Sequence, residues 1–147
     1  MTSFHRIAAA AALTFALLGS ACSSLTGSGA HKLVLSEPVC VNARFLKMKL
    51  NQQTTIVLDN NKAGPTQKGL SVTLSEFPVI IVGDVPQGST IGANFSTIRL
   101  STAPKEQKTV VVLPTGTGSY EITCNISLTT QSGLQVQQKT VTVQITQ

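Results

Sequence analysis

Alternation of apolar and polar residues is the pattern that most constrains the fold of this chain. The segments 70–74 (LSVTL), 119–126 (SYEITCNI) and 139–145 (KTVTVQI) each place their apolar side chains on one face of an extended strand. No window combines a helical period with capping residues. Further strands, rich in Val, Ile and Thr, are predicted at 32–35, 39–46, 45–50, 54–58, 78–82, 95–100 and 108–113.

Turn residues separate these strands at short intervals. Asp59-Asn60-Asn61 and Pro86-Gln87-Gly88 are typical turn clusters, and we interpret Thr115-Gly116-Thr117-Gly118 as a hairpin turn. Short strands with regular turns indicate an all-β sandwich, for which we expect about seven or eight strands. We expect residues 32–147 to form one such domain.

The first 21 residues have the features of an export signal. Arg6 supplies a positive charge, residues 7–18 are almost entirely apolar, and small residues follow at Gly19, Ser20 and Ala21. The apolar stretch is too short to span a bilayer as a helix. We therefore predict a signal peptide over residues 1–21, and exclude it from the folded domain.

The segment Leu18-Gly19-Ser20-Ala21-Cys22 resembles the lipobox of bacterial lipoproteins, in which the cysteine receives a diacylglyceryl group. Gly19 departs from that pattern because the family prefers leucine three residues before the cysteine. An ordinary signal-peptidase site after Ala21 is the alternative. A polar tether follows over residues 22–31, so we expect a lipid-anchored protein of the cell membrane or outer membrane, facing the periplasm or the cell exterior.

Three cysteines are present in the whole chain. If Cys22 carries lipid, Cys40 and Cys124 remain as an even pair in an oxidising compartment, and a disulfide is the simplest interpretation. It would close a loop of about 85 residues, for which chain-entropy reasoning gives roughly 4 kcal/mol of stabilisation. A buried free thiol or a metal-binding thiolate at Cys124 are the alternatives. We place Cys40 on an early strand.

The second half of the chain resembles the cupredoxins, small Greek-key sandwiches that carry blue copper, and the resemblance implies a Greek-key topology. The resemblance rests mainly on the motif Gly118-Ser119-Tyr120-Glu121-Ile122-Thr123-Cys124, which matches the strand that ends in the family's copper-binding cysteine. Residues 54–61 (TTIVLDNN) resemble the family's earlier strand, which ends in Asn. The match implies that the remaining ligand positions fall at Lys68, Thr129 and Leu134.

These positions lack the side chains that copper requires. A type 1 centre needs two imidazoles and a thiolate, whereas these positions carry Lys, Thr and Leu. His31 is the single histidine that remains once the signal is removed. The resemblance therefore implies the cupredoxin fold with degenerate ligand positions, and we predict no metal and no cofactor.

Composition excludes other classes of function. The formal net charge is +5, the basic residues are scattered and aromatic residues are few, which argues against nucleic-acid binding. The six acidic residues are dispersed and form no evident acid–base pair, so we predict no enzyme activity.

We expect a non-catalytic binding or scaffold module whose partners are the membrane, through its lipid, and an unidentified cell-envelope protein. One alternative is a copper-handling or electron-transfer protein that uses Cys124 with Met48 or His31. Another is an immunoglobulin-like adhesion domain, which would have a Cys40–Cys124 bridge between its two sheets.

Overall fold

The structure, a computed structural model, describes residues 31–147. The predicted signal peptide and the predicted lipidation site at Cys22 lie outside these residues. The described part confirms the predicted all-β sandwich and contains a single short helix. Its elements are β1 (His31–Leu35), α1 (Glu37–Asn42), β2 (Phe45–Lys49), β3 (Thr54–Asp59), β4 (Gln67–Phe77), β5 (Val79–Ile81), β6 (Thr90–Ile91), β7 (Ser96–Thr102), β8 (Gln107–Pro114), β9 (Gly118–Thr130) and β10 (Gly133–Thr146).

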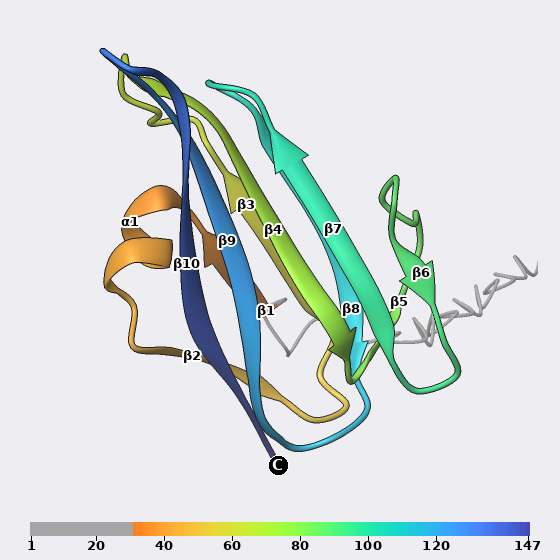
Figure 1. Cartoon of the computed structure of the whole chain (residues 1–147). Coiled ribbons are helices and arrows are strands. Elements are labelled where there is room, and N and C mark those ends of the chain that lie inside the picture. Colours follow the sequence, from red (N-terminus) through yellow and green to blue (C-terminus); the bar gives the residue numbers. More distant parts are fainter. Residues whose placement is uncertain (1–30) are drawn as a thin grey trace, which may run out of the picture.

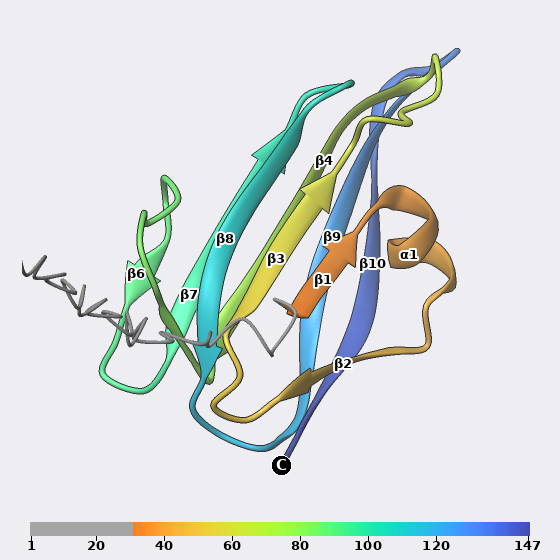
Figure 2. The ribbon, with the colours of Figure 1, turned by 180° about the vertical axis from the view of Figure 1, so that it is seen from behind.

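The strands form two layers that face each other (Figures 1 and 2). One sheet has four strands in the order β1-β3-β8-β5, and the other has six in the order β2-β10-β9-β4-β7-β6. The described residues therefore contain ten strands where we expected seven or eight, and two of the ten, β5 and β6, are only three and two residues long.

Most neighbouring strands are antiparallel, but each sheet has one parallel pair at an edge. β1 runs parallel to β3, and β2 runs parallel to β10. The chain leaves β1, passes through α1 and enters β2 in the other sheet. α1 therefore connects the two sheets at one side of the sandwich (Figure 2). The first 20 or so described residues thus close the same side of both sheets.

The predicted alternation accounts for the core. Leu70, Val72 and Leu74 of β4 point inward, and Val141, Val143 and Ile145 of β10 do the same, because successive side chains of a strand alternate between faces. Between these inward residues, β4 and β10 carry polar side chains on the outer face. Among the described residues, no buried side-chain nitrogen or oxygen lacks a hydrogen-bond partner.

The predicted strand over 39–46 is wrong, because its first part is the helix α1. Ser36 precedes the helix in an extended conformation, with φ of −135°, and Pro38 occupies the first turn, where its missing N–H costs nothing. Glu37 adds a negative charge to the same turn. The Cys40 N–H donates to the Ser36 carbonyl at 2.8 Å, so one turn of helix carries Cys40 inward.

The interpretation of residues 115–118 as a hairpin turn is also wrong. β8 belongs to the four-stranded sheet and β9 to the six-stranded sheet, so this segment crosses from one layer to the other. Gly118 has φ of +142°, and a Cβ there would lie 3.1 Å from the Tyr120 hydroxyl. The glycine therefore permits the tight entry into β9 beneath the tyrosine ring.

Candidate functional site

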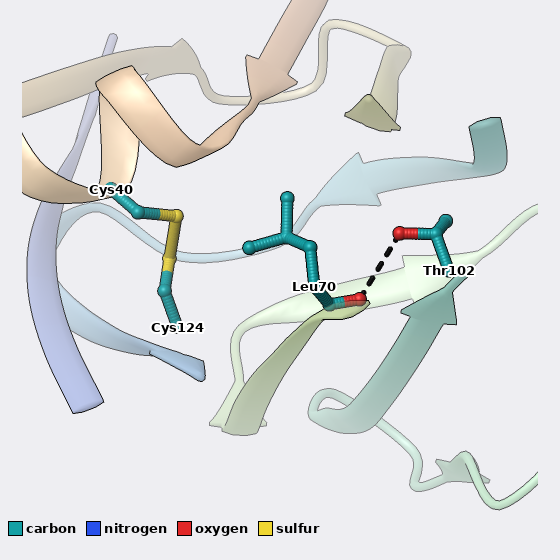
Figure 3. Close-up of a disulfide and its surroundings, with 4 residues drawn as sticks. All are labelled: Cys40, Leu70, Thr102 and Cys124. Atoms are coloured by element: carbon teal, nitrogen blue, oxygen red, sulfur yellow. Dashed lines mark hydrogen bonds between the residues drawn. A yellow bond between two sulfur atoms is a disulfide. The ribbon is translucent and has the colours of Figure 1, made fainter. Parts of the chain in front are cut away.

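The bond between Cys40 and Cys124 is confirmed. It joins α1 to β9, with 6.0 Å between the Cα atoms (Figure 3). Both residues are buried, with exposed fractions of 2% and 0%. Figure 3 shows the Leu70 side chain of β4 beside the sulfur atoms, and the Thr102 hydroxyl donates to the Leu70 carbonyl at 3.1 Å. The cysteine that the cupredoxin motif would offer to copper is thus a disulfide sulfur within the core.

The other positions implied by the cupredoxin motif do not meet at Cys124. Thr129 of β9 and Leu134 of β10 are cross-strand partners near the end of their hairpin, five residues along β9 from Cys124. Five residues of antiparallel strand span about 17 Å. Because five is an odd number, Thr129 also points to the opposite face of the sheet from Cys124.

Lys68 is exposed at the beginning of β4, where the pairing with β9 changes register between Gln67 and Gly69. The same end of the sheet is tied together by the Thr129 N–H, which donates to the Thr66 carbonyl at 2.7 Å. Among residues 31–147, no three side chains of the His, Cys, Asp and Glu types lie close enough together to hold a metal ion.

Sequence reasoning missed a buried amide pair at this end of the sandwich. Asn60, predicted as one residue of a turn cluster, is 2% exposed, and its side-chain oxygen accepts a hydrogen bond from the Gln67 amide at 2.6 Å. Its side-chain nitrogen donates to the Ala103 carbonyl at 3.0 Å, and its main-chain carbonyl accepts from the Lys105 N–H at 3.0 Å. Asn60 therefore fastens the β3–β4 connection to the β7–β8 connection.

A small cavity of about 210 Å³ adjoins Asn60. Its walls come from the end of β3, the β3–β4 connection and the beginning of α1, and they include Glu37, Asp59 and Lys62. The amides of Asn60 and Gln67 bond to each other, so this bond occupies the oxygen of one and the nitrogen of the other.

A larger groove of about 580 Å³ lies where the β5–β6 connection passes β4, β7 and β8. Asp84 brings one negative charge to its lining, and Arg99 and Lys108 bring two positive charges. Arg99 holds the connection in place, because its main-chain N–H donates to the Ser89 hydroxyl at 2.9 Å.

The outer face of the six-stranded sheet is polar and nearly uncharged at its centre. Cross-strand pairing aligns hydroxyl and amide side chains in rows, which place Thr73 beside Thr123 and Thr123 beside Thr140. The next row aligns Ser71, Asn125 and Gln138. Such a surface can donate and accept hydrogen bonds over a wide area without a dominant charge.

Comparison with known proteins identifies no family for this chain. No protein-family model matches it, and no curated protein matches it. Among solved structures, the chain is similar to the solution structure of Amebosin at 17% identity, over 80% of this chain and 99% of that chain, with a TM-score of 0.29. Similarity at that level does not show a shared fold. Of the described helices, none is long and apolar enough to cross a membrane.

Proposed function

We propose that this chain is an exported, lipid-anchored sandwich of cupredoxin type that has no type 1 copper site and acts as a non-catalytic binding or scaffold module of the cell envelope. The observation that carries the proposal is the buried disulfide between Cys40 and Cys124. A disulfide sulfur has no thiolate to give to a metal, and a blue-copper site depends on that thiolate.

The same bond supports export. Disulfides persist in oxidising compartments outside the cytoplasm and are rare within it. The signal predicted over residues 1–21 and the lipidation predicted at Cys22 agree with such a compartment, and lipidation leaves an even number of cysteines for pairing. A diacylglyceryl group supplies the two acyl chains that stable membrane anchoring requires.

The copper-handling alternative receives less support. It needs a free thiol at Cys124, but that cysteine is paired. Of its other candidate ligands, His31 is on β1, in the sheet opposite to that of Cys124, and its ring lies 3.5 Å from the Thr54 hydroxyl. We therefore do not favour a redox role.

The immunoglobulin-like alternative is also disfavoured. In immunoglobulin domains the disulfide joins strands of the two opposing sheets. Here one of its ends is on α1, which belongs to neither sheet. Tyr120 does donate its hydroxyl to the Thr117 carbonyl at 3.0 Å, but it stands four residues before Cys124, whereas the tyrosine of those domains stands two residues before its cysteine.

Copper titration of the purified, oxidised chain tests the proposal. We expect no stoichiometric tight copper and no intense thiolate-to-copper band in the visible spectrum. The Cys124→Ser variant serves as the control and should give the same spectrum as the parent chain. An intense band in the parent that disappears in Cys124→Ser would refute the proposal.

A further inference from the structure

The edge of β10 is paired along only part of its length. β9 accompanies β10 from Gly133 to Ile145, but β2 covers its other side only from Thr142 to Thr146. Figure 1 shows the β9–β10 hairpin extending past α1 at the end of the sandwich that is opposite the C-terminus. Residues 134–140 therefore have a neighbouring strand on one side only.

The main-chain groups on the open side can be identified from the pairing. The Thr129 N–H donates to the Thr66 carbonyl, which lies away from β10, so Thr129 and its partner Leu134 form a non-hydrogen-bonded pair. Such pairs alternate along an antiparallel ladder, so the N–H and C=O groups of Leu134, Val136 and Gln138 point outward. Within residues 31–147, no hydrogen bond reaches these outward groups.

Residues 134–138 of this open edge lack the features that protect sheet edges. Residues 131–138 (QSGLQVQQ) contain no charge and no proline, and the pairing with β9 has no bulge. Leu134 and Val136 are 68% and 60% exposed, and both lie on the outer face. An uncharged, regular edge with exposed apolar residues is a template for the addition of another strand.

We propose that the β10 edge pairs antiparallel with the β10 edge of a second copy of this chain, about a two-fold axis at Val136. In this register the outward residues face one another, with Val136 opposite the Val136 of the second copy and Leu134 opposite its Gln138. Lys139, the first charge along the edge, falls opposite Gly133, so no like charges meet. The contact is self-complementary, as a two-fold interface requires.

Sedimentation of the full chain carrying Cys22→Ser, which removes the proposed lipidation site, tests this pairing over a wide range of concentration. We expect a reversible monomer–dimer equilibrium. Val136→Lys and Val136→Glu should each weaken the dimer at least about 10-fold, because each puts two like charges directly opposite each other. An equal mixture of the two variants should form the dimer again, because Lys then faces Glu.

Ser71→Lys is the matched control. It adds the same charge to the same outer face, but on β4, two strands away from the edge, and should leave the dimer unchanged. Thermal unfolding should show that all variants remain folded, since Val136 is exposed. A chain that stays monomeric at about millimolar concentration, a Val136→Lys variant that dimerises normally, or a mixture that fails to recover would each overturn the proposal. A monomeric chain that captures a different extended segment at β10 would overturn it as well.

Discussion

The base and the tip of the β9–β10 hairpin have the same pairing but opposite environments. At the base, residues 118–126 and 137–145, inward side chains such as Ile122 and Val143 are completely buried, and β4 and β2 each lie beside part of this region. At the tip, residues 127–136, the side chains of β10 are exposed on both faces. The disulfide at Cys124 belongs to the base, whereas the implied ligand positions Thr129 and Leu134 belong to the tip.

The difference shows what each half contributes. The base supplies the stability of the fold, because its apolar side chains and its disulfide are removed from water. The tip adds little to the core and presents an unpaired edge to its surroundings. A copper site would have to combine groups from both halves, and the strand period places Cys124 and Thr129 on opposite faces.

Among changes at the base of the hairpin, removal of the disulfide should lower the free energy of unfolding most. The Cys40→Ala/Cys124→Ala double variant should lose about 4 kcal/mol of unfolding free energy, because the bond closes a long loop in the unfolded chain. Urea unfolding of the oxidised parent and the variant measures this loss. Cys22→Ser is the control and should not change the unfolding midpoint; a double variant as stable as the parent would refute this role of the bond.

Truncation of a large apolar side chain should cost more stability at the base of β10 than at its tip. Ile145→Ala at the base should cost about 2–5 kcal/mol, because Ile145 is only 2% exposed and its removal leaves a cavity. Leu134→Ala at the tip should change stability by less than about 0.5 kcal/mol. Both are measured by urea unfolding at low protein concentration. Equal losses at the two sites would contradict the distinction between base and tip.

Proline substitutions compare the covered and open parts of the β10 edge. Gln144→Pro removes an N–H on the side that β2 covers, and should cost on the order of 1–3 kcal/mol. Val136→Pro removes an N–H that points to solvent, a position where edge strands tolerate proline, and should cost less. Chemical unfolding measures both, and a larger loss for Val136→Pro would show that the open edge is covered in the monomer.

The smallest effect is expected from placing copper-binding side chains at the positions that the cupredoxin resemblance implies. Lys68→His, Thr129→His and Leu134→Met combined with Cys40→Ala provide two imidazoles, a thioether and a free thiol. We expect no blue-copper band even so, because Cys124 points into the core away from Thr129. Copper titration followed in the visible spectrum checks this, and a strong band would show that the positions do converge.

Side-chain alternation made the sandwich predictable, and the even pair of cysteines that remains beside Cys22 made the disulfide predictable. Val72, Ile122 and Val143 all lie in the core on the faces that the pattern assigns. The helix α1 was not predicted because the apolar residues around Cys40 look like a strand, and only Ser36 and Pro38 mark its beginning. Single turns of helix have too few residues to show a period.

The length of the β9–β10 hairpin and the burial of Asn60 could not be predicted for a different reason. The ends of β9 and β10 are rich in Ser, Thr and Gln. On β10 the apolar residues Leu134 and Val136 lie on the outer face and do not continue the inward pattern of Val143, so we expected these strands to be shorter than they are. The burial of Asn60 depends on its bonds to Ala103 and Gln67, which come together only in the folded chain. Local turn propensity cannot indicate such contacts.

Peptide mapping of the native, unreduced protein tests the central claim that Cys124 is a structural disulfide cysteine. The chain is denatured with an alkylating reagent and no reductant, digested, and analysed by mass spectrometry. We expect a linked pair of peptides that contains Cys40 and Cys124, two hydrogens lighter than the sum of the free peptides. Alkylation of Cys124 in the native preparation, with no linked pair, would contradict it.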